Sequence, residues 1–94
     1  MNFSVALTED NSINRKTFMQ KIKGFPELDI VFSSENGHEC LEQLKGLPHQ
    51  PLPQVIFIDL EMPEMDGLET IEIAKSWYPQ NHFLVLTFFD VVEN

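Results

Sequence analysis

The fold of this chain is decided by residues 55–67, whose sequence is VIFIDLEMPEMDG. Four apolar residues lead directly to the carboxylate of Asp59, and a loop rich in acidic residues, proline and glycine follows. An unbroken apolar run of this kind is typical of a buried strand in a parallel sheet. Because an unpaired charge is costly to desolvate, we expect Asp59 to have a partner or a function.

A second acidic group follows the apolar run 3–8, which leads to Glu9 and Asp10. If the two runs are neighbouring parallel strands, three carboxylates meet at one edge of the sheet. Two like charges ~4 Å apart repel each other by about 4 kcal/mol at an effective dielectric near 20. The three carboxylates therefore require a cation, a shared proton or greater separation, and without a metal at least one should have a raised pKa. This pattern predicts a divalent cation and phosphate chemistry.

The composition fits one small domain and argues against several classes of partner. The chain has 94 residues, 43% of them hydrophobic, and a net charge of −9 from six basic and fifteen acidic residues. This charge disfavours a nucleic-acid surface and docking on an anionic membrane. The chain has no recognisable signal peptide, no apolar run long enough to span a membrane, and one cysteine, so we expect a soluble cytoplasmic protein.

Strand-like and helix-like segments alternate along the chain. The predicted strands are 3–8, 29–34, 54–59 and 83–87, and the predicted helices are 12–23, a segment after 36–37, and one from Gly67 to about 77. This order predicts an α/β fold with a doubly wound parallel sheet, right-handed crossovers and helices on both faces. Strand 83–87 is apolar enough to be covered on both sides. Ligands of such sheets bind at the carboxyl ends of the strands, where Glu9, Asp10, Asp59 and Thr87 are expected.

Helical spacing predicts which side chains face the sheet. The inward residues would be Ile13, Phe18, Met19 and Ile22 in the first helix, Cys40, Leu41 and Leu44 in the second, and Leu68, Ile71, Ala74 and Trp77 in the third. Asp66 is expected to cap the third helix, and Gly67 to adopt an unusual backbone angle.

The chain resembles the receiver domain of bacterial two-component response regulators from residue 3 to about residue 90. The resemblance is carried by the acidic pair 9–10, the pattern D-x-E-M-P-x-M-D-G over 59–67, and the Leu-Thr pair 86–87. These motifs occur in the family's order, with its spacing, and on the expected elements. The resemblance implies a flavodoxin-like fold and one receiver domain over residues 1–94.

The resemblance also implies the roles of individual residues. Asp59 would accept a phosphoryl group from a sensor histidine kinase. Glu9 and Asp10 would bind Mg²⁺ together with Asp59 and the main-chain carbonyl of Glu61. The hydroxyl of Thr87 would bind a phosphoryl oxygen and draw its loop inward. An output domain or partner, in many relatives a DNA-binding domain that controls transcription, would read the change. The only reactions expected of the chain are slow self-phosphorylation and self-dephosphorylation.

Two features depart from the family pattern. The chain stops at Asn94, before the expected fifth strand, its lysine and the last helices, so the domain is expected to be incomplete at its C-terminal side. Phe88 follows Thr87 where most relatives have a small residue, and we expect it to narrow access to Asp59. Equal phosphorylation and hydrolysis rates in Phe88→Ala and the parent would refute this. Without a fifth strand, the apolar and uncharged run 83–89 becomes an edge, so we expect that the chain either forms a dimer through this region or is a piece of a longer protein.

Two other functions remain open at this point. The missing lysine and Phe88 are compatible with a non-phosphorylated interaction module that keeps the fold and has lost the switch. A phosphatase of the haloacid-dehalogenase kind also uses an Asp at a strand end and Mg²⁺, but it expects a second Asp where this chain has Glu61. Uptake of a phosphoryl group would distinguish the receiver from the inert module.

Overall fold

The computed structural model describes residues 2–46 and 52–86, in which strands and helices alternate strictly. In chain order the elements are β1 (Phe3–Thr8), α1 (Ser12–Ile22), β2 (Leu28–Ser34), α2 (Gly37–Lys45), β3 (Val55–Asp59), α3 (Gly67–Trp77) and β4 (His82–Leu86). The predicted α/β class is confirmed, and the strand bounds differ from the predicted ones by at most one residue. No described helix is long and apolar enough to cross a bilayer.

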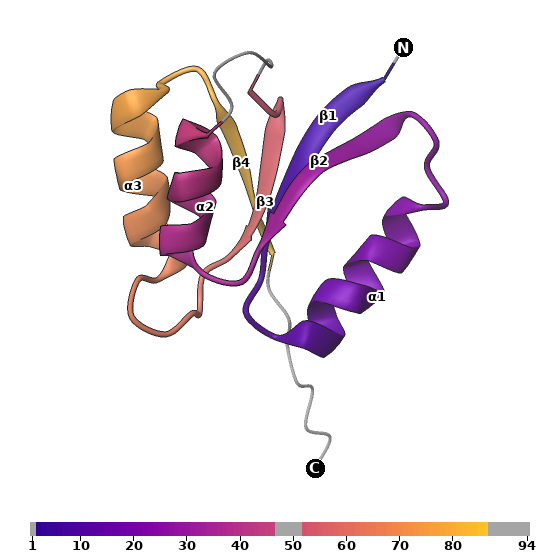
Figure 1. Cartoon of the computed structure of the whole chain (residues 1–94), viewed down its shortest axis with the longest axis horizontal. Helices are drawn as coiled ribbons and strands as arrows, with labels where there is room; N and C mark the ends of the chain where they lie inside the picture. Colours follow the sequence, from indigo (N-terminus) through magenta and orange to yellow (C-terminus); the bar gives the residue numbers. More distant parts are fainter. Residues whose placement is uncertain (1, 47–51, 87–94) are drawn as a thin grey trace.

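The described strands form one parallel sheet in the order β2-β1-β3-β4. From β1 the chain moves outward to β2 and then returns past β1 to β3, so the strand order reverses between β1 and β3. Helix α1 lies on one face of the sheet, and α2 and α3 lie together on the other (Figure 1). The sheet is therefore doubly wound, and its switch point lies at the carboxyl ends of β1 and β3.

Apolar side chains on both faces hold the central strands in place. The core between the sheet, α2 and α3 consists of Ala6, Phe32, Cys40, Leu41, Leu44, Ile56, Met65 and Ala74. On the α1 face, the ring of Phe18 packs against that of Phe57, with centroids 4.9 Å apart. Because β1 is buried from Val5 to Thr8, and Ile56 and Ile58 of β3 are fully buried, the residues at the carboxyl ends of both strands follow closely packed segments of the sheet.

A polar side chain fixes the start of each helix. Asn11, Asn36 and Asp66 are the N-cap residues of α1, α2 and α3, and their side-chain oxygens accept backbone N–H groups of the first turn at 2.8 to 2.9 Å. These bonds satisfy donors that the helix itself leaves free. The capping role predicted for Asp66 is therefore confirmed.

The predicted inward faces of α1 and α3 are partly wrong. Ile13 is 72% exposed, Leu68 is 60% exposed and Trp77 is 38% exposed. Ala74 is buried as predicted, and α3 also buries Gly67 and Thr70, which were not predicted. The reason is that α3 packs beside α2, where Gly37 approaches the Thr70 hydroxyl closely enough to leave no space for a Cβ atom. Thr70 therefore lies on the side of α3 that faces α2.

Strand β4 is less covered than its apolar sequence suggested. Within the described residues β4 pairs with β3 alone, and Leu84 and Val85 are 52% and 41% exposed. The expectation that this strand is covered on both sides is therefore wrong for the described part of the chain. Association of two copies through β4 stays a prediction. Thr87 and Phe88, to which site roles were assigned, lie outside the described residues.

Candidate functional site

Three carboxylates meet at the switch point of the sheet. Thr8 at the end of β1 lies opposite Ile58 of β3, so the residues that follow them, Glu9 and Asp59, emerge at the same level. One carboxylate oxygen from each of Glu9, Asp10 and Asp59 lies within 4.8 Å of the other two. The convergence predicted from the strand pattern is therefore present in the structure.

The three acidic residues differ strongly in exposure. Glu9 is completely buried, Asp59 is partly buried and Asp10 is exposed. The Glu9 backbone N–H donates to the carbonyl of Ser34 at 3.0 Å, and its Oε1 accepts the N–H of Asn11 at 3.0 Å. Its other oxygen, Oε2, is buried and has no hydrogen-bond partner among the described residues. A buried acceptor of this kind requires a proton or a cation.

The environment of Glu9 favours its protonated form. Burial raises the pKa of this carboxyl from 4.5 to about 7, while the hydrogen bond from Asn11 acts in the opposite direction. The neighbouring charges of Asp59 and Asp10 raise the pKa further. This confirms the prediction that at least one of the three carboxylates has a raised pKa in the absence of a metal.

The backbone after β3 orients the Asp59 carboxylate. The N–H of Glu61 donates to Asp59 Oδ1 at 3.1 Å, which places the main chain of Glu61 directly beside this side chain. In the same loop Met62 and Met65 are buried, as predicted for packing residues. Glu64 adopts φ 68°, in the left-handed region that non-glycine residues rarely occupy. The buried side chains of Met62 and Met65 thus anchor the loop on both sides of the exposed residues 63–64.

Gly67 brings the start of α3 against the end of β3. Its N–H donates to the carbonyl of Leu60 at 2.9 Å, and a Cβ atom at this position would collide with the Asp59 carbonyl and come 2.7 Å from Leu60 Cα. The predicted unusual backbone angle is wrong, because no glycine among the described residues has a positive φ. Glycine is required here for the close approach of two backbones beside Asp59.

Arg15 is a residue of this site that the sequence analysis missed. Its Nη1 donates to the main-chain carbonyl of Glu9 at 2.8 Å, and its Nη2 lies 3.6 Å from Oε1 of Glu35. Arg15 is four residues after the cap residue Asn11, to whose carbonyl its own backbone N–H donates at 2.9 Å. The sequence signal that points to this contact is a basic residue in a helix that follows an acidic pair, placed one turn after the start of the helix.

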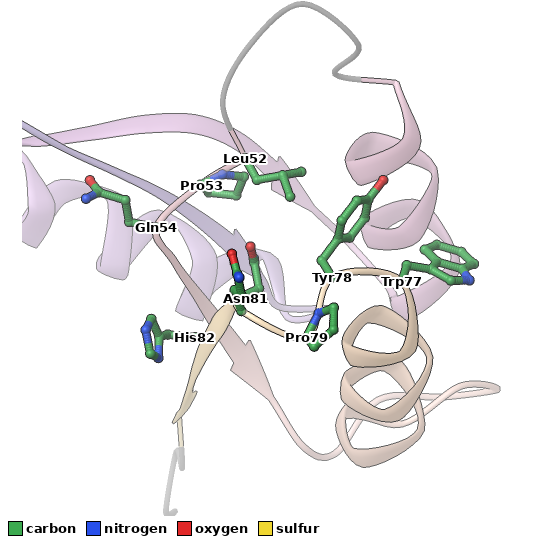
Figure 2. A pocket seen from close by; sticks show the side chains of 9 residues that line it. Leu52, Pro53, Gln54, Trp77, Tyr78, Pro79, Asn81 and His82 are labelled. Atoms are coloured by element: carbon green, nitrogen blue, oxygen red, sulfur yellow. The ribbon is translucent and has the colours of Figure 1, made fainter.

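A hollow at the opposite end of the sheet carries no comparable chemistry. It has a volume of about 540 Å³ and lies near the start of β4, where Pro53, Trp77, Tyr78, Asn81 and His82 contribute to its lining (Figure 2). None of its lining residues is acidic, lysine or arginine. We therefore assign the candidate function to the carboxylates at the carboxyl end of the sheet, where titratable groups converge.

The family is established by comparison with known proteins. The model of the response regulator receiver domain matches residues 5–94. The chain belongs to the receiver domain family. A protein-glutamate methylesterase/protein-glutamine glutaminase of Halalkalibacterium halodurans is 33% identical over 75 residues, which are 80% of this chain and 20% of that protein. The transcriptional regulatory protein LnrK of Bacillus subtilis is 29% identical over 85 residues, which are 90% of this chain and 37% of LnrK.

Solved receiver domains share the fold. The receiver domain of NarL from Mycobacterium tuberculosis superimposes with a TM-score of 0.80 at 22% identity, covering 97% of this chain and 70% of that one. The response regulator domain of CheB from Thermotoga maritima gives a TM-score of 0.77 at 22% identity, covering 90% and 60%. The parallel sheet with order β2-β1-β3-β4 is therefore the flavodoxin-like arrangement of receivers. The chain spans about a fifth of the methylesterase named above. The match therefore covers a regulatory domain of that relative and not the relative's whole length.

Proposed function

We propose that this chain is a phosphorylatable signalling switch, in which Asp59 accepts a phosphoryl group from a sensor histidine kinase in the presence of Mg²⁺. The observation that carries the proposal is the cluster of Glu9, Asp10 and Asp59, with oxygens within 4.8 Å of one another at the switch point of a receiver fold. Family membership supports the same reading. The cluster combines a candidate acceptor carboxylate with two further acidic groups that suit a cation.

The residues present fit a small, hard divalent cation. Mg²⁺ takes oxygen ligands at about 2.1 Å, so two ligand oxygens lie at most about 4.2 Å apart, and the oxygens of this cluster, within 4.8 Å of one another, are close to that limit. The buried Oε2 of Glu9 lacks a partner among the described residues, and a cation would satisfy it. Glu9, Asp10 and Asp59 would hold the ion, and the main-chain carbonyl of Glu61 completes the proposed ligand set. When bound, the ion neutralises negative charge on the carboxylates and the incoming phosphoryl oxygens.

The environment of Asp59 suits nucleophilic attack on phosphorus. The hydrogen bond from the Glu61 N–H restrains Oδ1 and leaves Oδ2 without that restraint. In the proposed reaction an Asp59 oxygen forms a bond to phosphorus while the bond between phosphorus and the kinase histidine breaks, and the imidazole nitrogen keeps the electron pair. The product is an aspartyl phosphate, which water later hydrolyses. Positioning and charge neutralisation supply most of the catalysis of phosphoryl transfer.

The output of the switch is proposed to lie in a partner or an attached domain. Thr87 follows Leu86, which pairs with Asp59 in the sheet, and it is the residue proposed to contact the phosphoryl group and move with it. LnrK is a transcriptional regulatory protein, and its match to this chain covers 37% of its length. We propose transcriptional control as the output for this chain, by analogy with that relative.

Intact-mass measurement after incubation with acetyl phosphate and Mg²⁺ tests the proposal. We expect one phosphoryl adduct on the parent and none on Asp59→Asn. Asp66→Asn is the matched control, because it makes the same chemical change in the same loop and keeps a residue able to cap α3. It should carry the adduct, and chelation of Mg²⁺ should prevent it.

Two results would contradict the proposal. An adduct that persists on Asp59→Asn would place the reaction on another residue. No adduct on the parent, shown to be folded by circular dichroism, would favour the non-phosphorylated interaction module. In that case Phe88→Ala, treated in the same way, would show whether access to Asp59 is the obstacle.

A further inference from the structure

Arg15 joins two loops at the carboxyl edge of the sheet. From the second turn of α1, Nη1 donates to the Glu9 carbonyl at 2.8 Å, and Nη2 lies 3.6 Å from Glu35 in the connection between β2 and α2. The Arg15 side chain is only 20% exposed, whereas that of Glu35 is 66% exposed. The enclosed guanidinium thus makes its shorter and less solvated contact with the Glu9 carbonyl. A hydrogen bond from a charged donor is among the stronger ones in proteins.

The carbonyl that Arg15 holds belongs to the peptide unit joining Glu9 to Asp10. Holding this oxygen restrains the plane of the peptide unit, and thereby ψ of Glu9 and φ of Asp10, the torsions that help to set the directions of the two side chains. The remaining groups of Glu9 are also tied down, since its N–H donates to Ser34 and its Oε1 accepts from Asn11. Only Oε2 of Glu9 lacks a partner among the described residues, and it belongs to the carboxylate cluster.

We infer that Arg15 is a positioning residue, which holds the Glu9–Asp10 peptide so that both carboxylates are preorganised for a divalent cation. The inference rests on the proposed function, because it concerns the cation of the same site. Hydrogen bonds that orient metal ligands contribute strongly to affinity, and their loss typically weakens metal binding about tenfold or more.

The charge of Arg15 makes the inference testable, because positioning and charge repulsion predict opposite changes in Mg²⁺ affinity when Arg15 is replaced. A positive side chain close to a cation site repels the cation, so a purely electrostatic role predicts tighter Mg²⁺ binding when the charge is removed. Loss of positioning predicts weaker binding. Arg15→Met removes the guanidinium and retains much of the apolar stem, and Arg15→Lys keeps the charge without the planar fork. Under the inference, both variants bind Mg²⁺ about tenfold more weakly than the parent.

Two control variants separate positioning from charge and from global stability. Lys16→Met removes a positive charge from the adjacent exposed residue, which makes no side-chain hydrogen bond or ion pair among the described residues. We expect its Mg²⁺ affinity to equal or slightly exceed that of the parent. Ile22→Ala removes buried volume at the far end of α1 and lowers stability without a contact to Glu9. Its affinity should be parental at a temperature where it is folded.

The measurement is the Mg²⁺ dissociation constant by isothermal titration calorimetry, at a temperature well below the unfolding midpoint of every variant. Weaker binding in both Arg15 variants and parental binding in both controls supports the inference. If the parent binds Mg²⁺ and the Arg15 variants bind it equally or more tightly, the inference fails and the proposed function stands. Equal weakening in Ile22→Ala would also overturn it. If the folded parent binds no Mg²⁺, the cation role in the proposed function fails, and the inference with it.

Discussion

Replacing the buried carboxyl of Glu9 by an amide should change how the stability of this protein depends on pH. The pKa of Glu9 is raised from 4.5 to about 7 in the folded state, chiefly by burial. Between these two values the folded chain keeps a proton that the unfolded chain has released. Because the folded state binds more protons, the free energy of unfolding falls as the pH rises through this window. Glu9→Gln has no carboxyl to titrate at this position. Its free energy of unfolding should therefore lack this part of the decrease with rising pH.

The size of the effect follows from the shift. One pKa unit corresponds to about 1.4 kcal/mol, so the rise from 4.5 to about 7 corresponds to an upper limit of about 3.4 kcal/mol. The cluster lies at the edge of the sheet beside the exposed Asp10, and water screens the charges there. Allowing for this screening, we expect about 1 to 2 kcal/mol. The contribution is complete below about pH 4.5 and is lost above about pH 7.

Urea unfolding followed by circular dichroism at pH 5, 6, 7 and 8, in buffer with a chelator, would measure this contribution. The difference between parent and Glu9→Gln cancels the pH dependence of groups common to both chains. Relative to the parent, the variant should gain about 1 to 2 kcal/mol from pH 5 to pH 8. Parallel curves for the two proteins would refute the reasoning. Under the proposed function, Mg²⁺ should stabilise the parent more at pH 8 than at pH 5, because metal ligands bind in their ionised form.

Two further predictions concern the surroundings of the site and the packing of the helices. Gly67→Ala should lower the free energy of unfolding by about 1 to 3 kcal/mol in urea titrations, because its Cβ would collide with the backbone of Asp59 and Leu60. Gly46→Ala, whose nearest contact would be 3.3 Å, is the control, and equal losses in both would contradict the steric explanation. Lys45→Met should lower stability by about 0.5 to 1 kcal/mol and shift the emission of Trp77, since Lys45 Nζ lies 4.4 Å from the centre of that ring. Trp77 is the only tryptophan, so an unchanged spectrum would show that the contact is absent in solution.

The strands and the meeting of the carboxylates could be predicted because both depend on local patterns. The apolar runs before Glu9 and Asp59 are short and end on acidic residues, which indicates buried strands and places the acids at carboxyl ends. Alternation with helices then implies parallel strands whose carboxyl ends share one edge. The capping role of Asp66 was predictable for the same reason, since it depends on residues within one turn of the helix.

The orientation of the helices could not be predicted from the same patterns. Helical spacing describes a stripe along a helix, but contacts with residues distant in sequence decide which part of the surface is buried. In α3, Thr70 lies on the buried side against Gly37 of α2, whereas Leu68 is exposed. Ile13 lies in the first turn of α1, and helical spacing placed it on the same face as the inward residues. Its side chain is nevertheless exposed, because the core does not extend to this end of the helix.

The sequence by itself determined the order of the elements, the class of the fold and the three carboxylates at one edge, because each follows from a local pattern or from the geometry of parallel strands. Only the tertiary structure decided that Glu9 is buried and Asp10 exposed, and that Arg15 holds the peptide between them. Adjacent acidic residues look equivalent in a sequence. Their exposure and their hydrogen bonds depend on how β1, β2 and α1 pack around them, and this packing buries Glu9, raises its pKa and leaves Asp10 exposed.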